Sequence, residues 1–249
     1  MFLRQAAVQV RAQTIKYQVA GAGEPVLLLH GLAGSVRWWQ RNVAALAEHH
    51  TVYLVNLPGF GAFRKRGAQF ALHQAADWLA EWMDAADIGP CHVVAHSMGG
   101  FITIRLAARR PDLVRRLALV GPAGVPAGRP LLRYAGPIVA AGLAASPLFL
   151  PTLALDSLRA GPRTLVRAAR DLLAEDIRTD LPAVTAPTLL VWGTRDALVS
   201  PDVGPVMRAA LPDARLLYLP GAGHVAQFDR HREFNAAALA FLAGEAVGE

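Results

Sequence analysis

The sequence predicts an α/β fold, with a mostly parallel, twisted sheet of about eight strands flanked by helices. Two observations carry this prediction. Short apolar runs alternate with longer amphipathic segments, which is the pattern of buried parallel strands joined by helices. One of these runs, residues 91–95, passes through an abrupt turn at Ser97 into a helical segment that begins near Met98. The alternation is broken only over residues 122–183, which are rich in Pro, Gly, Ala and Leu.

Length and composition agree with a single well-packed domain. At 249 residues the chain can form one α/β domain with an insertion but is short for two domains. Hydrophobic residues make up 53% and charged residues 18%, which indicates a buried core. The net charge of +6 comes mainly from arginines scattered along predicted helices, so nucleic-acid binding is not expected. The single cysteine, Cys91, excludes an intrachain disulfide and is expected to be a buried structural thiol.

Membrane association is not expected either. The most apolar stretch, residues 135–155, is interrupted by Pro137, Pro147 and Pro151, and no run reaches the ~18 residues of a membrane helix. The first residues carry no apolar signal-peptide block. These features predict a cytoplasmic protein, monomeric or homodimeric, that acts on a small molecule.

The first quarter of the chain predicts an edge hairpin and two buried strands. In residues 5–20 apolar and polar side chains alternate with a period of two, which is typical of a hairpin with one solvent-exposed face. The short apolar runs at 26–29 and 51–55 predict strands covered on both sides by helices. Trp38 and Trp39 lie between these runs and are expected to begin the intervening helix.

The rest of the chain continues the alternation on both sides of the insertion. An amphipathic helix is predicted over 72–86, and residues 91–95 form the strand before Ser97. The later elements are predicted at 98–110 (helix), 113–120 (strand), 131–143 and 162–173 (helical pieces of the insertion), 188–192 and 215–219 (strands), and from about 230 onward (helix).

The turn at Ser97 has the pattern small-x-Ser-x-Gly. Ala95 stands two residues before the serine and Gly99 two residues after it. Small side chains are needed at both positions because the strand meets the helix at very close range. The serine is then held in a strained backbone conformation with its hydroxyl exposed at the edge of the sheet.

This turn, the His-Gly segment at residues 30–31 and the interruption after the predicted sixth strand resemble the α/β-hydrolase family, in its esterase-like serine hydrolase branch. The resemblance implies a core domain of residues 1–121 and 184–249. It also implies that residues 122–183 are a helical cap, or lid, that walls the substrate pocket with apolar side chains.

The resemblance also implies the catalytic residues. Ser97 corresponds to the nucleophile, and Asp196 and His224, each directly after an apolar strand, complete the order Ser…Asp…His. The backbone amides of Leu32 and Met98 correspond to the oxyanion hole. The residues assigned to the pocket or its surroundings are His30, Gly31, Trp38, Trp39, His96, Leu198 and Val225. Of these, His30 and His96 are interpreted chiefly as structural, and one of the two tryptophans is assigned to the pocket wall.

The expected reaction is hydrolysis of a carboxylic ester with a small-to-medium apolar part, through an acyl-enzyme on Ser97. No His, Cys and carboxylate cluster has metal-ligand spacing, so neither a metal nor a cofactor is expected. Carbon–carbon bond hydrolases share Ser-Met-Gly-Gly, but they usually carry other residues where this chain has His96 and Val225. That activity, lactonase, perhydrolase and thioesterase activity remain alternatives. A non-catalytic protein that binds a hydrophobic ligand is the alternative from another class.

Overall fold

An eight-stranded sheet runs through the computed structural model, which describes residues 3–61, 71–126 and 134–247. The strand order is β1-β2-β4-β3-β5-β6-β7-β8. β2 pairs antiparallel with β1 and with β4, and every other neighbouring pair is parallel. The strands are β1 Arg4–Val10, β2 Gln13–Ala20, β3 Glu24–Leu29, β4 His50–Val55, β5 Cys91–His96, β6 Val114–Val120, β7 Thr188–Gly193 and β8 Ala214–Leu219. The predicted fold class and the edge hairpin are confirmed.

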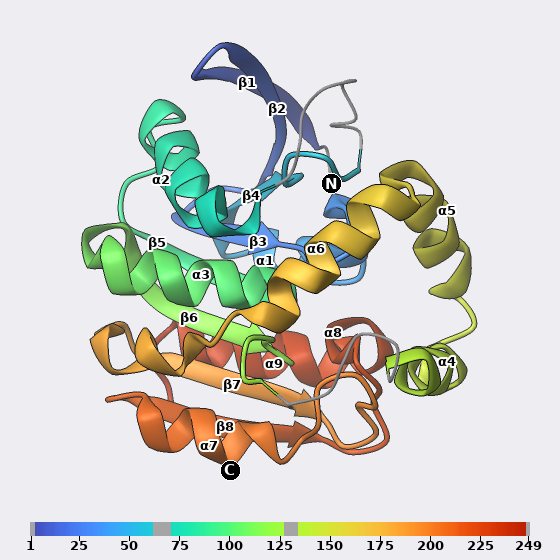
Figure 1. The fold of residues 1–249 in the computed structure, drawn as a ribbon. Helices are drawn as coiled ribbons and strands as arrows, with labels where there is room; N and C mark the ends of the chain where they lie inside the picture. Colours follow the sequence, from blue (N-terminus) through green and yellow to red (C-terminus); the bar gives the residue numbers. More distant parts are fainter. Residues whose placement is uncertain (1–2, 62–70, 127–133, 248–249) are drawn as a thin grey trace.

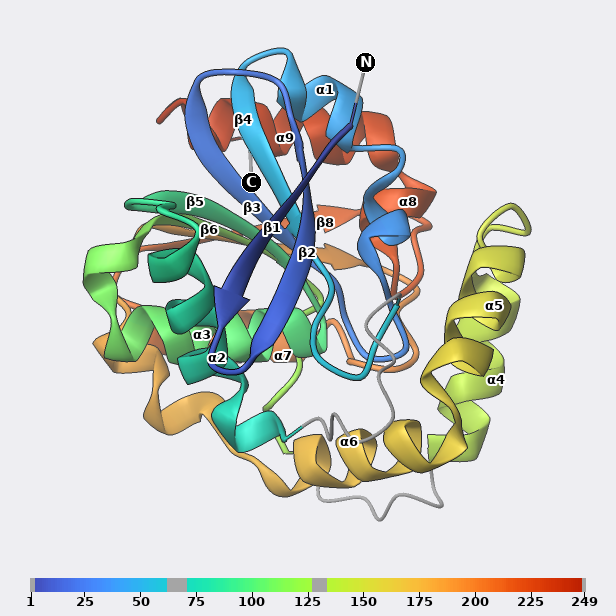
Figure 2. The same cartoon turned by 90° about the horizontal axis from the view of Figure 1, so that it is seen from above.

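Helices cover both faces of this sheet. Figure 2 shows α1 and α9 on one side, and α2, α3 and α7 on the other. The core helices are α1 Val43–Ala47, α2 Ala75–Ala85, α3 Met98–Arg109, α7 Val203–Ala210, α8 Ala226–Asp229 and α9 His231–Leu242. Short 3-10 turns connect several of them: η1 Val36–Trp39, η2 Leu72–Gln74, η3 Pro111–Leu113, η5 Ile177–Thr179 and η6 Leu181–Ala183.

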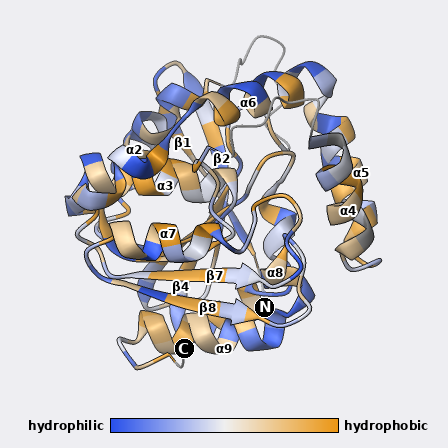
Figure 3. Ribbon diagram, turned by 60° about the horizontal axis from the view of Figure 1, so that its bottom comes forward, coloured by the Kyte–Doolittle hydropathy of each residue, from blue (hydrophilic) through white to orange (hydrophobic). Residues whose placement is uncertain are grey.

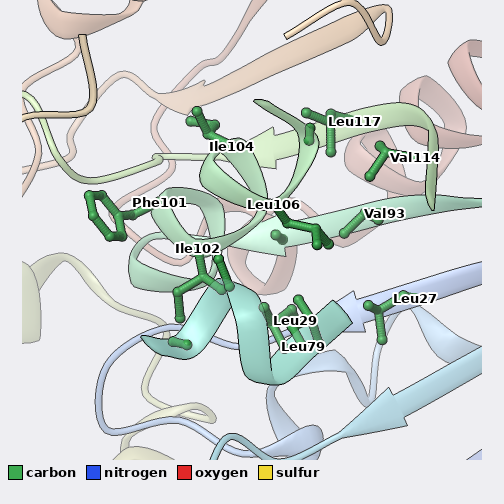
Figure 4. Close-up of a cluster of buried hydrophobic side chains, with 14 of the residues drawn as sticks. Leu27, Leu29, Leu79, Val93, Phe101, Ile102, Ile104, Leu106, Val114 and Leu117 are labelled. Atoms are coloured by element: carbon green, nitrogen blue, oxygen red, sulfur yellow. The ribbon is translucent and has the colours of Figure 1, made fainter. Parts of the chain in front are cut away.

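The central strands are apolar along their length because both of their faces are covered. Every residue of β5 and β7 is buried, and β7 is coloured as mainly hydrophobic in Figure 3. Successive side chains of a strand point to opposite faces, so the core forms two clusters, one under each helical layer. Figure 4 shows one of them, in which Ile102 and Leu106 of α3 lie near Leu29 and Val93 of the sheet. This packing fixes α3, and with it the turn at Ser97.

Among its described residues, the predicted cap contains the α-helices α4 Ala135–Ala144, α5 Leu150–Ala160 and α6 Pro162–Ala174. We call residues 134–174 the cap segment. In Figure 1, α4 and α5 lie beyond the arrowheads of β7 and β8, at the carboxyl ends of the strands, and α6 leads back across the sheet. Ligands of open α/β sheets bind at this edge. The division into core and cap domains remains a prediction.

Two expectations about individual elements need correction. Trp38 and Trp39 do not begin a helix of regular length but end η1, and α1 starts only at Val43. In the insertion, α5 is a separate helix that the apolar stretch 135–155 does not reveal, because Pro151 lies in its first turn, where proline is tolerated. Of the helical piece predicted at 131–143, residues 131–133 lie outside the described residues.

Candidate active site

Ser97 lies between β5 and α3 in a conformation that few non-glycine residues adopt. Its φ of 53° and ψ of −116° mark a strained backbone. The Ser97 amide donates to the carbonyl of Val120 at 2.9 Å, which ties the turn to β6. A Cβ atom at Gly99 would stand 2.6 Å from the carbonyl oxygen of His30, so only glycine fits there. The close approach expected from the small-x-Ser-x-Gly pattern is present.

The structure brings Ser97, His224 and Asp196 together from three strand ends. His224 Nε2 lies 3.0 Å from Ser97 Oγ, and His224 Nδ1 lies 2.7 Å from Asp196 Oδ2. All three side chains are buried, each with less than a tenth of its surface exposed. A hydroxyl, an imidazole and a carboxylate in this order form a path along which the serine proton can move to the imidazole.

Asp196 is oriented by its own loop. Its Oδ1 accepts hydrogen bonds from the amides of Leu198 (2.9 Å) and Val199 (3.0 Å), which leaves Oδ2 for His224. A Cβ atom at Gly121, where φ is +47°, would lie 3.1 Å from Asp196 Oδ2. Leu198 therefore contributes its backbone amide to the site, whatever its side chain does.

The loop at residues 31–34 packs directly beside the serine. A Cβ atom on Gly31 would stand 3.0 Å from Ser97 Cβ. The loop closes as a turn, with the Gly34 amide donating to the Gly31 carbonyl at 3.1 Å and Ala33 at a φ of 63°. Within the described ranges, neither the Leu32 amide nor the Met98 amide donates to a backbone carbonyl. The assignment of these two amides to an oxyanion hole stays a prediction.

His30 braces this loop from inside the protein. Its Nε2 accepts a hydrogen bond from the Leu57 amide at 3.1 Å, so the ring proton is on Nδ1, which donates to the Gly31 carbonyl at 2.8 Å. Complete burial lowers the pKa of His30 from 6.5 to about 4, although the hydrogen bond to Gly31 opposes this shift. The imidazole is therefore neutral near pH 7, and its role is structural.

The depressed pKa of His30 predicts an acid-dependent loss of stability. Between pH 6.5 and about 4 the unfolded chain binds a proton that the folded imidazole rejects. The free energy of unfolding therefore falls as the pH falls, with a contribution of up to about 1.4 kcal/mol per pH unit from this one group. His30→Gln is expected to reduce the slope, measured by urea unfolding between pH 7 and 4.5. An unchanged slope would contradict the assignment.

His96 stabilises the position of His224. Its Nε2 donates to the backbone carbonyl of His224 at 2.9 Å, and the two ring centroids are 4.7 Å apart. Burial, together with the neighbouring His224, lowers the pKa of His96 well below 6.5. The neutral imidazole of His96 holds the loop of His224 through this hydrogen bond, in agreement with the structural interpretation.

The two tryptophans lie in different side-chain clusters. The Trp38 ring lies 5.6 Å from that of His96 and 5.0 Å from that of Phe149 at the start of α5. Val225 is buried in the same cluster. Trp39 instead packs against Phe234 of α9 in the core cluster under α1 and α9. Successive residues of a 3-10 turn diverge by about 120°, so we place only Trp38 beside the site and remove Trp39 from the pocket wall.

Two carboxylates near the site are absent from the sequence-based assignment. Asp156 of α5 is completely buried and accepts hydrogen bonds from residues 35–38. Asp229 accepts from the amide of Ser146 in the cap segment (3.1 Å) and from that of Gly223 beside His224 (3.0 Å), and burial raises its pKa. For Asp156 a signal exists in the sequence, because it is the only acidic residue between Asp112 and Asp171.

Within the described parts of the chain, no group of three or more His, Cys, Asp and Glu side chains is arranged to hold a metal ion. None of the described helices is both long enough and apolar enough to cross a membrane. The cytoplasmic location, the monomeric or homodimeric state and the lack of macromolecular partners stay predictions.

Comparison with known proteins identifies the family. A family model for the α/β-hydrolase fold matches residues 24–145 and 143–231, which is most of the chain. The chain belongs to the α/β-hydrolase family. The resemblance drawn from the turn at Ser97 is thus confirmed, and the eight-stranded, mostly parallel sheet is the fold of that family.

Three similar proteins show how far activities spread among α/β-hydrolases related to this one. A putative carbamate hydrolase RutD from Variovorax paradoxus is 32% identical, over 92% of this chain and 96% of its own. The dihydrolipoyllysine-residue acetyltransferase component of the acetoin cleaving system from Cupriavidus necator is 30% identical over 92% of this chain, which spans 67% of that relative. The crystal structure of a membrane phospholipase A, a bacterial virulence factor, superimposes with a TM-score of 0.84 at 28% identity, covering 97% and 86% of the two chains.

Proposed function

We propose that this α/β-hydrolase is a serine hydrolase that cleaves carboxylic esters with a small-to-medium apolar part. The observation that supports the proposal most strongly is the hydrogen-bonded series Ser97–His224–Asp196, with distances of 3.0 and 2.7 Å. Family membership supports hydrolysis in general. The choice of an ester is inferred from the apolar side chains next to the site, Trp38, Phe149 and Val225.

In the proposed acylation step, Ser97 Oγ attacks the ester carbonyl carbon while His224 Nε2 takes its proton. The negative charge that develops on the carbonyl oxygen is stabilised by the amides of Leu32 and Met98. The tetrahedral intermediate collapses, the carbon–oxygen bond to the alcohol breaks, and His224 returns the proton to the leaving alcohol. Asp196 keeps the imidazole in the tautomer that accepts at Nε2 and stabilises the imidazolium.

In deacylation, water takes the place of the alcohol. His224 removes a proton from the water, whose oxygen attacks the acyl carbon, and the proton then passes to Ser97 Oγ as the carboxylic acid leaves. The catalytic residues end in their starting states, so the cycle needs no other reactant.

The proposal is tested with p-nitrophenyl esters from acetate to dodecanoate. We expect turnover of short to medium acyl chains, a decline toward dodecanoate, and no turnover above background in Ser97→Ala. The acyl length with the highest kcat/KM measures the apolar space near Ser97. Absence of turnover across the whole series in the folded wild-type protein would overturn the ester proposal.

Carbamate hydrolysis is a second candidate, favoured by the relative named as a putative carbamate hydrolase. A carbamate carbonyl would use the same nucleophile and oxyanion donors, with a carbamoyl-enzyme in place of the acyl-enzyme. p-Nitrophenyl N-butylcarbamate and p-nitrophenyl hexanoate, which have acyl chains of the same length, separate the two candidates. A higher kcat/KM for the carbamate would favour this second function over ester hydrolysis.

A further inference from the structure

The cap segment is tied to the core through a buried carboxylate. Asp156 of α5 is 0% exposed. Its Oδ2 accepts from Ser35 Oγ at 2.7 Å and from Trp38 Nε1 at 3.1 Å, and its Oδ1 accepts from Arg37 Nη2. Three donors from one short core segment, residues 35–38, thus converge on one side chain of the cap segment.

Hydrophobic burial does little to hold α5 in place beyond its start. Phe149, at the start of α5, packs between Trp38 and Phe228 with ring centroids 5.0 and 4.9 Å away. Within α5 itself the buried residues are Asp156 and Ala160, whereas Leu158 is 76% exposed. In the second half of the helix, the small side chain of Ala160 is the buried apolar contact with the core, and Asp156 makes the polar contact.

The segment that Asp156 contacts belongs to the surroundings of Ser97. Residues 35–38 directly follow the loop at 31–34, which packs against Ser97. Trp38 holds Asp156 with its indole nitrogen and places its ring 5.6 Å from that of His96, the residue before the serine. A shift of α5 would therefore move the wall next to the reacting ester.

Attaching a helix through a buried carboxylate costs desolvation free energy. Its desolvation is offset only when it is paired and its oxygens are fully hydrogen-bonded, and an apolar pair often gives equal or greater stability. Each of the three hydrogen bonds is directional, so together they fix the orientation of the carboxylate. The arrangement therefore suits exact placement of α5 more than overall stability.

We propose that Asp156 is a positioning residue that fixes α5 against residues 35–38 and thereby sets the acyl-binding space in front of Ser97. It acts through Trp38 and does not touch the reacting atoms. The assignment of that space to an acyl group rests on the proposed ester hydrolysis. The contact itself is independent of that function.

Asp156→Asn tests the proposal with little change in shape. The amide has one acceptor oxygen, whereas Arg37 and Trp38 both need an acceptor and cannot accept a bond from the new amide group. At least one donor is left unpaired, and Arg37 loses its counter-charge.

We expect the KM of Asp156→Asn for p-nitrophenyl octanoate to rise about tenfold or more, while kcat and the rate of Ser97 phosphonylation change less than about twofold. Hydrogen exchange should accelerate in α5 and stay unchanged in β5.

The matched control is Asp171→Asn, a carboxylate of α6 in the same cap segment, which should alter neither KM nor exchange. Arg37→Gln leaves the carboxylate in place, and it should reproduce the rise in KM if Asp156→Asn does not fold. Wild-type KM with unchanged exchange in α5 would overturn the proposal, as would an equal fall in kcat for all chain lengths. If the wild-type protein cleaves no ester, the function proposal fails, and the exchange experiment alone decides the role of Asp156.

Discussion

Ser97→Ala is expected to lower ester turnover by about a millionfold, because the variant lacks the atom that forms the acyl-enzyme. The methyl group of alanine fits the space of the serine side chain, and the bonds that hold the turn use backbone atoms only, from the Ser97 amide to Val120 and from Ala123 to the Ser97 carbonyl. The fold should therefore remain. Residual turnover would come from the oxyanion donors and binding alone.

The serine variant is measured by the initial rate of p-nitrophenolate release, with circular dichroism and thermal unfolding as checks of the fold. Ser200→Ala is a suitable control, because Ser200 is exposed and bonds Asp202 in a loop after β7. This control should keep wild-type turnover. A folded Ser97→Ala protein with more than about a hundredth of wild-type kcat would show that another group is the nucleophile, since triad variants lose far more.

Asp196→Asn is expected to lower kcat about ten-thousandfold while the fold and KM change little. The amides of Leu198 and Val199 both donate to Oδ1, so the asparagine oxygen will take that position. Its NH2 group must then face His224 Nδ1, where Oδ2 now lies at 2.7 Å. Nδ1 has to accept, the ring proton moves to Nε2, and the imidazole can no longer accept the proton of Ser97.

The aspartate variant has a distinctive pH signature. Turnover should recover in part at alkaline pH, where a hydroxide-assisted route needs no imidazole base, and it should do so without a change in thermal stability. Asp213→Asn, at an exposed position before β8, is the matched control and should behave as wild type. A loss of less than about tenfold in Asp196→Asn would contradict its role in orienting His224.

The residues of the triad arrangement could be found from sequence because each follows an apolar run. Cys91–His96 and Thr188–Gly193 are completely buried strands, and Ala214–Leu219 is a partly buried strand at the edge of the sheet. Parallel strands present their carboxyl ends at one edge. Ser97, Asp196 and His224 stand at or just after those ends. The apolar runs place these residues at strand ends, and the resemblance to the α/β-hydrolase family selects them as the catalytic candidates. The distances that make them a reactive group come only from the fold.

The hydrogen-bond partners of Asp156 and the different directions of Trp38 and Trp39 could not be predicted from the sequence. The donors to Asp156 lie 118–121 residues away along the chain, and no local pattern links positions so far apart. The two tryptophans are neighbours of the same type, and the 3-10 geometry of η1, not their identity, sends one toward His96 and the other toward α9. Side-chain direction in short turns depends on tertiary packing more than on propensity.

The most direct test of the central claim, that Ser97 is the nucleophile, is active-site labelling with a p-nitrophenyl alkylphosphonate. The serine oxygen attacks phosphorus, p-nitrophenolate leaves, and a stable adduct that mimics the tetrahedral intermediate remains. We expect about one p-nitrophenolate released per chain, a matching mass increase, and peptide sequencing that locates the adduct on Ser97, with no adduct in Ser97→Ala. An adduct on another residue, or none at all on the folded protein, would contradict the account.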